Sequence, residues 1–134
     1  MTKPSAFFRA LGDPTRLRIV NLLSRRSLCV CDIQRILEQP QSSISRHLAL
    51  LKSAGLVRDR RDGMRTFYAL TDWNSRLARG VLAAIRAHLA VEGAYQADME
   101  ELEALRARGD CHEEPKQPRH AGRRSGRVEA RMEA

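Results

Sequence analysis

The sequence predicts a mainly α-helical domain with one small β-hairpin. Apolar residues recur at helical spacing in several short segments, and glycine, proline and serine breaks separate these segments. One Asp62-Gly63 pair lies between two short runs of strand-like residues. Only 4% of the 134 residues are aromatic, so the core must consist of leucine, isoleucine, valine and alanine. Such a core suits a small helical domain.

Four short helices are expected in the first half of the chain. Asp13 is a favourable N-cap and Pro14 is tolerated in a first turn, so the second helix should begin there. Pro40 should end the third helix, and Ser42 or Ser43 should cap the fourth. The four helices are predicted over residues 5–11, 14–24, 31–38 and about 43–54.

A hairpin and a long helix are expected in the second half. The tight turn between residues 56–61 and 64–70 is assigned to Asp62-Gly63, because it needs a positive φ. One helix should then span residues 73–109, weakened at Gly93. Its apolar stripe is interpreted as a dimer seam, and the alternative is a cover for the domain's own core. The stripe comprises Leu77, Val81, Ile85, Leu89, Tyr95, Met99, Leu102 and Leu105.

This order of elements is that of a winged helix-turn-helix. The predicted domain covers residues 1–109 and combines DNA binding with dimerisation. Residues 110–134 form a basic tail, almost without large apolar residues, that is expected to be disordered.

The charge indicates a polyanionic partner. The formal net charge is +8 and the isoelectric point is near 10.4. The positive charge is concentrated in residues 1–91, whereas residues 92–114 are acidic and the remainder is basic again. This asymmetry favours nucleic acid as the partner, and a well-solvated surface is the alternative.

Other classes of protein are not expected. No apolar run is long enough for a membrane span or a secretory signal, and three cysteines are too few for a secreted disulfide scaffold. We therefore expect a cytoplasmic protein that contains thiols and does not bind a membrane. No general acid–base pair, nucleophile constellation or phosphate loop is apparent, so an enzyme is not expected either.

The fourth helix and the hairpin carry the residues predicted to bind DNA. Polar side chains gather at the start of this helix, where a recognition helix meets base edges in the major groove. Arginines flank the hairpin turn, where they suit phosphates or a minor groove. An ordinary amphipathic helix and an edge strand protected by charge are the alternatives. The predicted DNA-binding residues are Gln41, Ser42, Ser43, Ser45, Arg46 and His47 of the helix, and Arg60, Arg61 and Arg65 of the hairpin.

The segment Leu28-Cys29-Val30-Cys31-Asp32 resembles the metal-site motif of the ArsR/SmtB family of metalloregulatory repressors. The segments Leu11–Leu17, Ser43–Leu48 and Gly55–Val57 extend the resemblance, which spans residues 5–107. It implies a homodimer, paired through the first and last helices, that represses an operator with two half-sites. It also implies release of the double-stranded DNA when a toxic ion binds. The motif is most similar to the arsenite and antimonite branch, As(III) or Sb(III), and also to the cadmium and lead branch, Cd(II) or Pb(II).

The spacing of the two cysteines predicts a switch without reference to the family. Residues i and i+2 of a helix point about 200° apart, so Cys29 and Cys31 cannot bind one ion within regular helix. In extended chain they lie on the same side. An ion should therefore unwind, or hold open, the start of the third helix, which packs on the recognition helix. Two inert cysteines and a redox-responsive pair are the alternatives.

The third ligand is where the chain departs from the family pattern. Gln34 occupies the position of the third cysteine of the arsenite branch, and residues 1–12 contain no cysteine for the cadmium and lead branch. Cys111 is therefore the candidate third ligand beside Cys29 and Cys31, and an exposed thiol that binds nothing is the alternative. At the family's zinc-site positions on the last helix only Asp72 and His88 are suitable ligands, so a zinc sensor is not expected. These positions hold Asp72, Asn74, Ile85 and His88.

Overall fold

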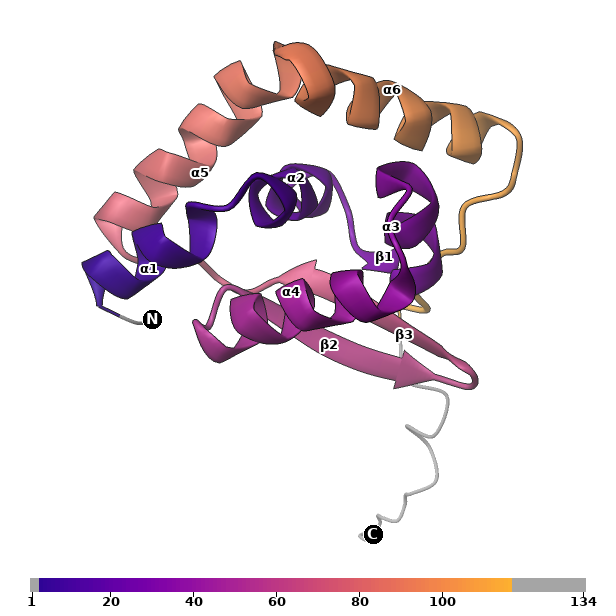
Figure 1. The fold of residues 1–134 in the computed structure, drawn as a ribbon, viewed down its shortest axis with the longest axis horizontal. Helices are drawn as coiled ribbons and strands as arrows, with labels where there is room; N and C mark the ends of the chain where they lie inside the picture. The colour runs from indigo at the N-terminus through magenta and orange to yellow at the C-terminus, as the bar shows by residue number, and fades with distance from the viewer. Residues whose placement is uncertain (1–2, 117–134) are drawn as a thin grey trace, which may run out of the picture.

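The structure, a computed structural model, describes residues 3–116 and confirms a winged helix-turn-helix. Helices α5 and α6 arch over α2 and α3, while α4 and the sheet lie on the opposite side (Figure 1). Residues 117–134 of the predicted tail lie outside the described part. The elements are α1 (Pro4–Leu11), α2 (Pro14–Leu23), β1 (Leu28–Cys29), α3 (Val30–Leu37), α4 (Gln41–Ser53), β2 (Val57–Asp62), β3 (Arg65–Leu70), α5 (Arg76–His88), the 3₁₀ turn η1 (Leu89–Val91) and α6 (Gly93–Ala107).

Asp13 caps α2 as the sequence predicts. Its Oδ2 accepts hydrogen bonds from the backbone N–H groups of Thr15 at 2.9 Å and Arg16 at 3.1 Å. Burial alone would raise the pKa of Asp13, but these N–H groups and the neighbouring charges of His47 and Arg16 lower it below its usual value. The carboxylate therefore stays charged at the positive end of the helix.

The turn between α3 and α4 is tighter than expected. Glu38 adopts the left-handed conformation with φ 55°, and α4 begins at Gln41 with Pro40 as its N-cap. The prediction that Ser42 or Ser43 caps α4 is therefore wrong. Proline is already extended at Pro40, so the chain enters the helix directly after it. The hydroxyl of Ser43 instead donates to Oε1 of Gln39 at 3.0 Å.

The sheet has three antiparallel strands in the order β1-β3-β2. The two-residue strand β1 was not predicted; it pairs Cys29 with Phe67 and so fixes the cysteine segment to the wing. The hairpin β2–β3 is confirmed, but its loop is Gly63 and Met64, because Asp62 still pairs with Arg65. Only Gly63 of these two has a positive φ, at 63°, as in a type II′ turn.

The predicted long helix is two helices. The chain breaks at Glu92, which is extended, and at Gly93, whose φ is 44°. The prediction of one continuous helix is wrong because a glycine with positive φ follows an extended residue, and together they redirect the chain. Met99, Leu102 and Leu105 of α6 are buried in the domain's own core, so this part of the stripe covers the core. Leu77 of α5 remains 46% exposed.

The core lies between the helices and one face of the sheet. Ile19, Ile33, Leu48 and Leu56 are fully buried at its centre. Among residues 3–116, no helix has the length and apolar character needed to cross a lipid bilayer.

Candidate metal centre and nucleic-acid interface

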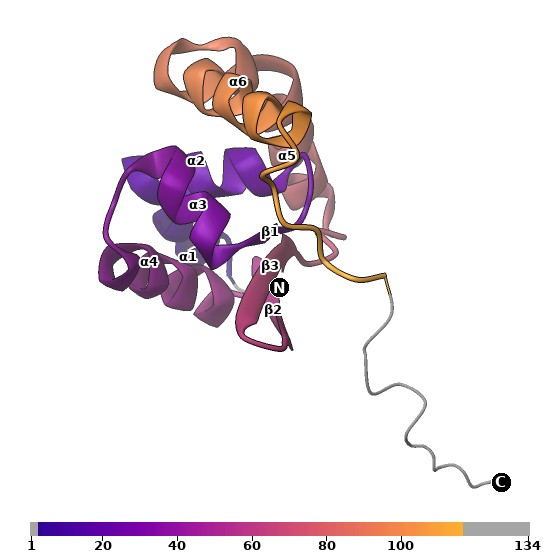
Figure 2. The same cartoon turned by 90° about the vertical axis from the view of Figure 1, so that its right-hand side faces the viewer.

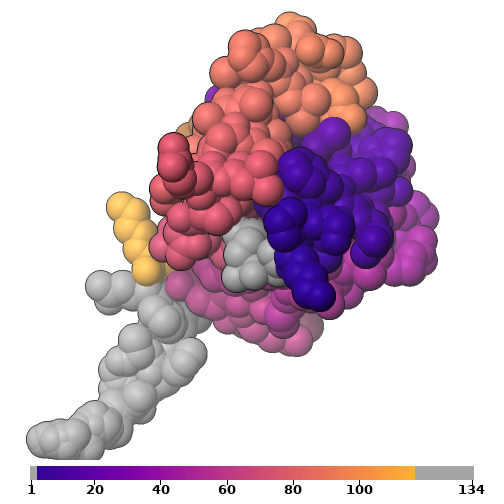
Figure 3. All heavy atoms as spheres, turned by 90° about the vertical axis from the view of Figure 1, so that its left-hand side faces the viewer, coloured from indigo at the N-terminus to yellow at the C-terminus, as the bar shows by residue number. Residues whose placement is uncertain are grey.

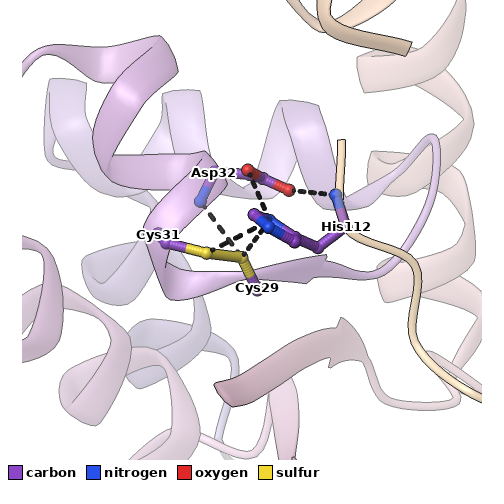
Figure 4. Close-up of side chains that lie close together, drawn as sticks. All are labelled: Cys29, Cys31, Asp32 and His112. Carbon is purple, nitrogen blue, oxygen red and sulfur yellow. Dashed lines mark hydrogen bonds and ion pairs between the residues drawn. A yellow bond between two sulfur atoms is a disulfide. The ribbon is translucent and has the colours of Figure 1, made fainter. Parts of the chain in front are cut away.

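The two cysteines of the predicted site lie at the junction of β1 and α3. Cys29 ends the strand and is the N-cap of α3, with φ −76° and ψ 156°, and Cys31 belongs to the first turn of the helix. Their Cα atoms are 5.3 Å apart and their sulfurs form a disulfide (Figure 4). Both sulfurs therefore lie on one side while the helix is intact. Of the two expected forms, an unwound or an open start of α3, the structure has the open one, because Cys29 lies outside the helix in an extended conformation.

His112 approaches both sulfurs from the far end of the chain. Its Nδ1 lies 3.6 Å from Sγ of Cys29, 3.5 Å from Sγ of Cys31 and 3.2 Å from Oδ1 of Asp32 (Figure 4). One ligand atom from each of these four residues lies within 4.8 Å of the others. Sequence reasoning did not place His112 in this group, and its position next to Cys111 was the only signal available.

Asp32 is a fully buried carboxylate that holds this arrangement together. Its Oδ2 accepts a hydrogen bond from the backbone N–H of His112 at 2.8 Å, and its Oδ1 lies 3.4 Å from Nη1 of Arg35. Its own backbone N–H donates to Sγ of Cys29 at 3.2 Å. A buried carboxylate needs such partners, so Asp32 fixes the backbone of His112 beside the sulfurs.

Cys111, the predicted third ligand, is a half-buried free thiol. Its sulfur lies 3.8 Å from the carbonyl oxygen of its neighbour, and it is not part of the four-donor group found in the described residues. Burial raises the pKa of the Cys111 thiol, and the negative charge of Asp32 raises it further. The environment of Cys111 thus favours the neutral thiol, whereas metal ligation requires the thiolate.

The donor set fits a thiophilic ion once the disulfide is reduced. Reduced sulfurs in contact are about 4 Å apart, a span that two metal–sulfur bonds of about 2.3 Å can bridge. The N–H of Asp32 and the N-terminus of α3 stabilise a thiolate at Cys29. Thiolates exclude hard ions such as Ca²⁺ and Mg²⁺.

A pocket of about 230 Å³ borders the two cysteines and joins them to both predicted DNA-binding parts. Its lining includes Gln41 at the start of α4 and Arg65 at the wing. The site therefore lies where α3, the recognition helix and the wing meet.

The predicted recognition residues divide into two groups. Ser43 and His47 are half-buried and face other protein groups. Nδ1 of His47 lies 3.3 Å from Nη1 of Arg16 and 3.7 Å from Oδ2 of Asp13, so this side chain links α4 to the start of α2. The exposed members of the set are Gln41, Ser42, Ser45 and Arg46.

The wing arginines also divide into two groups. Arg61 and Arg65 are exposed near the tip of the hairpin. Nε of Arg60 lies 3.1 Å from Oε2 of Glu114, and Arg58 reaches the same carboxylate at 3.1 Å. Two of the four wing arginines therefore share one carboxylate, which comes from a residue that follows α6.

Comparisons with known proteins identify one family. A family model described as "Bacterial regulatory protein, arsR family" matches residues 13–59. An uncharacterized HTH-type transcriptional regulator of Methanocaldococcus jannaschii, MJ1325, is 48% identical over 71 residues, which are 52% of this chain and 80% of that protein. The arsenic resistance transcriptional regulator ArsR1 of Pseudomonas putida is 38% identical over 103 residues, 73% of this chain and 80% of that protein. A cadmium resistance transcriptional regulatory protein CadC homolog of Staphylococcus aureus is 42% identical over 66 residues, 48% of this chain and 54% of that protein.

Solved structures of related chains share the fold. The reduced form of HlyU from Vibrio cholerae superposes with a TM-score of 0.57 and 28% identity, and the match covers 66% of this chain and 88% of HlyU. The homodimeric winged helix-turn-helix DNA-binding domain of Mb0332 from Mycobacterium bovis, a possible ArsR-family transcriptional regulator, has a TM-score of 0.54 and 30% identity. That match covers 66% of this chain and 82% of the domain.

Proposed function

The chain belongs to the ArsR/SmtB family of winged helix-turn-helix transcriptional repressors, and we therefore propose that it releases its operator when a thiophilic ion binds Cys29 and Cys31. Family members of this kind are DNA-binding regulators and not enzymes. The regulator would act in the cytoplasm, where its thiols are kept reduced.

The observation that carries the proposal is the position of the two sulfurs. They lie together at the first turn of α3, and the pocket beside them is also lined by Gln41 of α4 and Arg65 of the wing. An ion bound there contacts the junction of both proposed DNA-binding parts. A small displacement of α4 or of the wing by the bound ion would therefore alter the fit of both to DNA.

The identity of the ion depends on its third donor. Relatives named for arsenic resistance and for cadmium resistance are both similar to this chain. A third thiolate, from Cys111, would favour arsenite or antimonite, which are strongly thiophilic. A nitrogen or carboxylate donor would favour a divalent cation such as Cd(II) or Pb(II).

For the DNA side, we propose that Gln41, Ser42, Ser45 and Arg46 meet base edges while Arg61 and Arg65 contact the backbone. Their exposure supports this division. We propose that Ser43 and His47, which belong to the same set, have a supporting role, since each contacts another protein group. We propose that Arg60 contacts a phosphate only when it leaves Glu114. Two copies of this surface would read two half-sites about one DNA turn apart.

We also propose that the homodimer forms through α1 and α5. These helices share one face of the molecule (Figure 3). Phe8 of α1 is 49% exposed and Leu77 of α5 is 46% exposed, although both are large apolar residues. A second copy would remove this apolar surface from water. The homodimeric domain of Mb0332 supports the assembly.

The proposed function is tested on a fragment of the gene's own promoter. The reduced full-length protein, bound to labelled DNA, is titrated with arsenite, antimonite, Cd²⁺, Pb²⁺ and Zn²⁺ while fluorescence anisotropy is recorded. Release by at least one thiophilic ion in the wild type, and its loss in Cys29→Ser and Cys31→Ser, is expected. If no ion releases the wild type, or if both variants still respond, the proposal is wrong.

The disulfide favours a second candidate function, a repressor controlled by oxidation. Peroxide would accept two electrons and two protons from the thiols of Cys29 and Cys31 and would leave as two water molecules, while the S–S bond forms. Release by peroxide, reversed by dithiothreitol and absent in Cys29→Ser, would support this function. Release by an ion under reducing conditions would support the first.

A further inference from the structure

Residues 110–116, which we call the strap, return from the end of α6 across the body of the protein. They run past β1 and reach the β2 side of the sheet (Figures 1 and 2). Along this path Nη1 of Arg35 donates to the carbonyl oxygen of Asp110 at 3.3 Å, and Nη2 of Arg26 lies 3.3 Å from Oε2 of Glu113. The strap is therefore bound at several points, although it contains no regular secondary structure.

One part of the strap lies on the thiol site. The backbone N–H of His112 is held by the buried carboxylate of Asp32, and its imidazole Nδ1 lies within 3.6 Å of both sulfurs. The ring thus reaches the site from an anchored backbone. An imidazole nitrogen, two thiolates and an adjacent carboxylate form the donor set of a four-coordinate d¹⁰ divalent cation.

The other part of the strap lies on the wing. Glu114 has a side chain only 8% exposed, and its carboxylate accepts from Arg58 and pairs with Arg60. Nη2 of Arg60 also donates to the carbonyl oxygen of Pro115. The strap thus places a carboxylate on two arginines of the wing.

We propose that His112 is the third protein ligand of a divalent-cation site completed by Cys29 and Cys31, and that the bound cation fastens the strap onto Arg58 and Arg60 of the wing. Only one residue, Glu113, separates His112, which binds the cation, from Glu114, which pairs with the two arginines. Binding energy at the sulfurs therefore opposes any DNA phosphate that competes with Glu114. The effect on DNA rests on the proposed function, whereas the ligand set does not.

The ligand set is tested with Cd²⁺ as the probe. The reduced full-length protein is titrated in competition with a chelator, and the ultraviolet thiolate-to-cadmium absorbance is recorded. We expect His112→Ala to lower the affinity for Cd²⁺ at least about tenfold. Cys111→Ser should lower it less than about twofold. A loss in His112→Ala that is no larger than the loss in Cys111→Ser overturns the ligand assignment.

A spectroscopic measurement distinguishes binding of the cation by His112 from a purely structural role of this residue. The imidazole nitrogens of ¹⁵N-histidine protein are recorded by NMR with and without Cd²⁺. One Nδ1 resonance, absent in His112→Ala, should shift when Cd²⁺ is added. If the signal of His112 does not move while the cadmium–thiolate band forms, His112 is not a ligand.

The strap's effect on the wing is tested on promoter DNA. We expect Glu114→Gln to bind Cd²⁺ as tightly as the wild type does. The factor by which Cd²⁺ lowers DNA affinity should be at least about threefold smaller in this variant than in the wild type. Glu103→Gln on α6 removes the same charge outside the strap and should behave like the wild type. An unchanged Cd²⁺ effect in Glu114→Gln overturns the coupling. If Cd²⁺ binds through His112 but neither Cd²⁺ nor any other thiophilic ion releases the wild-type protein from DNA, the proposed function fails and the ligand set stands.

Discussion

Asp98 of α6 accepts two hydrogen bonds from the guanidinium of Arg18 on α2, each 2.8 Å long. The carboxylate is 5% exposed, whereas Arg18 keeps 24% of its side-chain surface in water. Because this bidentate pair joins residues 80 positions apart, it holds the arch of α5 and α6 onto the body.

Asp98→Asn should therefore destabilise the protein. We expect the free energy of unfolding to fall by about 2 kcal/mol, less than for a fully buried pair because water still reaches Arg18. Urea denaturation followed by circular dichroism measures it. The exposed pair of Arg108 and Glu101 provides the control, since Glu101→Gln should change stability by less than about 0.5 kcal/mol. Equal losses in the two variants would contradict the assigned role of Asp98.

The cap at Asp13 predicts a pH-dependent loss of stability. Asp13→Ala should cost about 1 kcal/mol at neutral pH, because two helix N–H groups lose their acceptor. The folded-state pKa of Asp13 lies below its usual value of 3.8, so its contribution is complete above that pH and is lost as the pH falls through the folded value. Thermal unfolding of both proteins between pH 7 and pH 3 tests this. A stability difference that grows below pH 4 would rule the account out.

The wing predicts a change in salt dependence. Arg61 and Arg65 are exposed, so their joint replacement by alanine should weaken binding to all DNA sequences. The slope of log K against log salt should become shallower by about 2, since each phosphate contact contributes about 0.9. Adding Arg60→Ala should change this slope less than either of the other two replacements, because Arg60 is already paired with Glu114. An unchanged slope in the double variant would exclude the wing from DNA.

The exposed apolar face predicts the dimer interface. Leu77→Glu on α5 should weaken dimerisation at least about tenfold, because it places a charge within the proposed contact. Sedimentation equilibrium measures the dissociation constant. Met64→Glu is the matched control, since Met64 is 93% exposed at the wing tip, away from α1 and α5. A dimer that tolerates Leu77→Glu would place the interface elsewhere.

Local signals predicted most of the fold. The Asp13-Pro14 start of α2, the turn at Pro40 and the glycine of the hairpin act on residues next to them in the chain, so each could be predicted from the local sequence. The break at Gly93 was harder to predict, because an isolated glycine in an apolar stripe is often tolerated within a helix. Strand β1 has only two residues and depends on pairing with β3, which no local pattern reveals.

The candidate site was predicted only in part. Cys29 and Cys31 are two positions apart, and the resemblance of their segment to the family's metal-site motif indicated a shared ligand. His112 lies 81 residues beyond Cys31 and reaches it only because α6 ends near α3 and Asp32 binds the returning backbone. The pairing of Glu114 with Arg60 likewise depends on the path of the strap, which composition could not indicate.

The central claim is that ion binding at Cys29 and Cys31 and operator binding oppose each other. Isothermal titration of the reduced protein with Cd²⁺, free and saturated with promoter DNA, tests it most directly. Linkage requires the two effects to be equal, so DNA should weaken Cd²⁺ binding by the same factor by which Cd²⁺ weakens DNA binding, about 5- to 150-fold. Equal Cd²⁺ affinities with and without DNA would contradict the account.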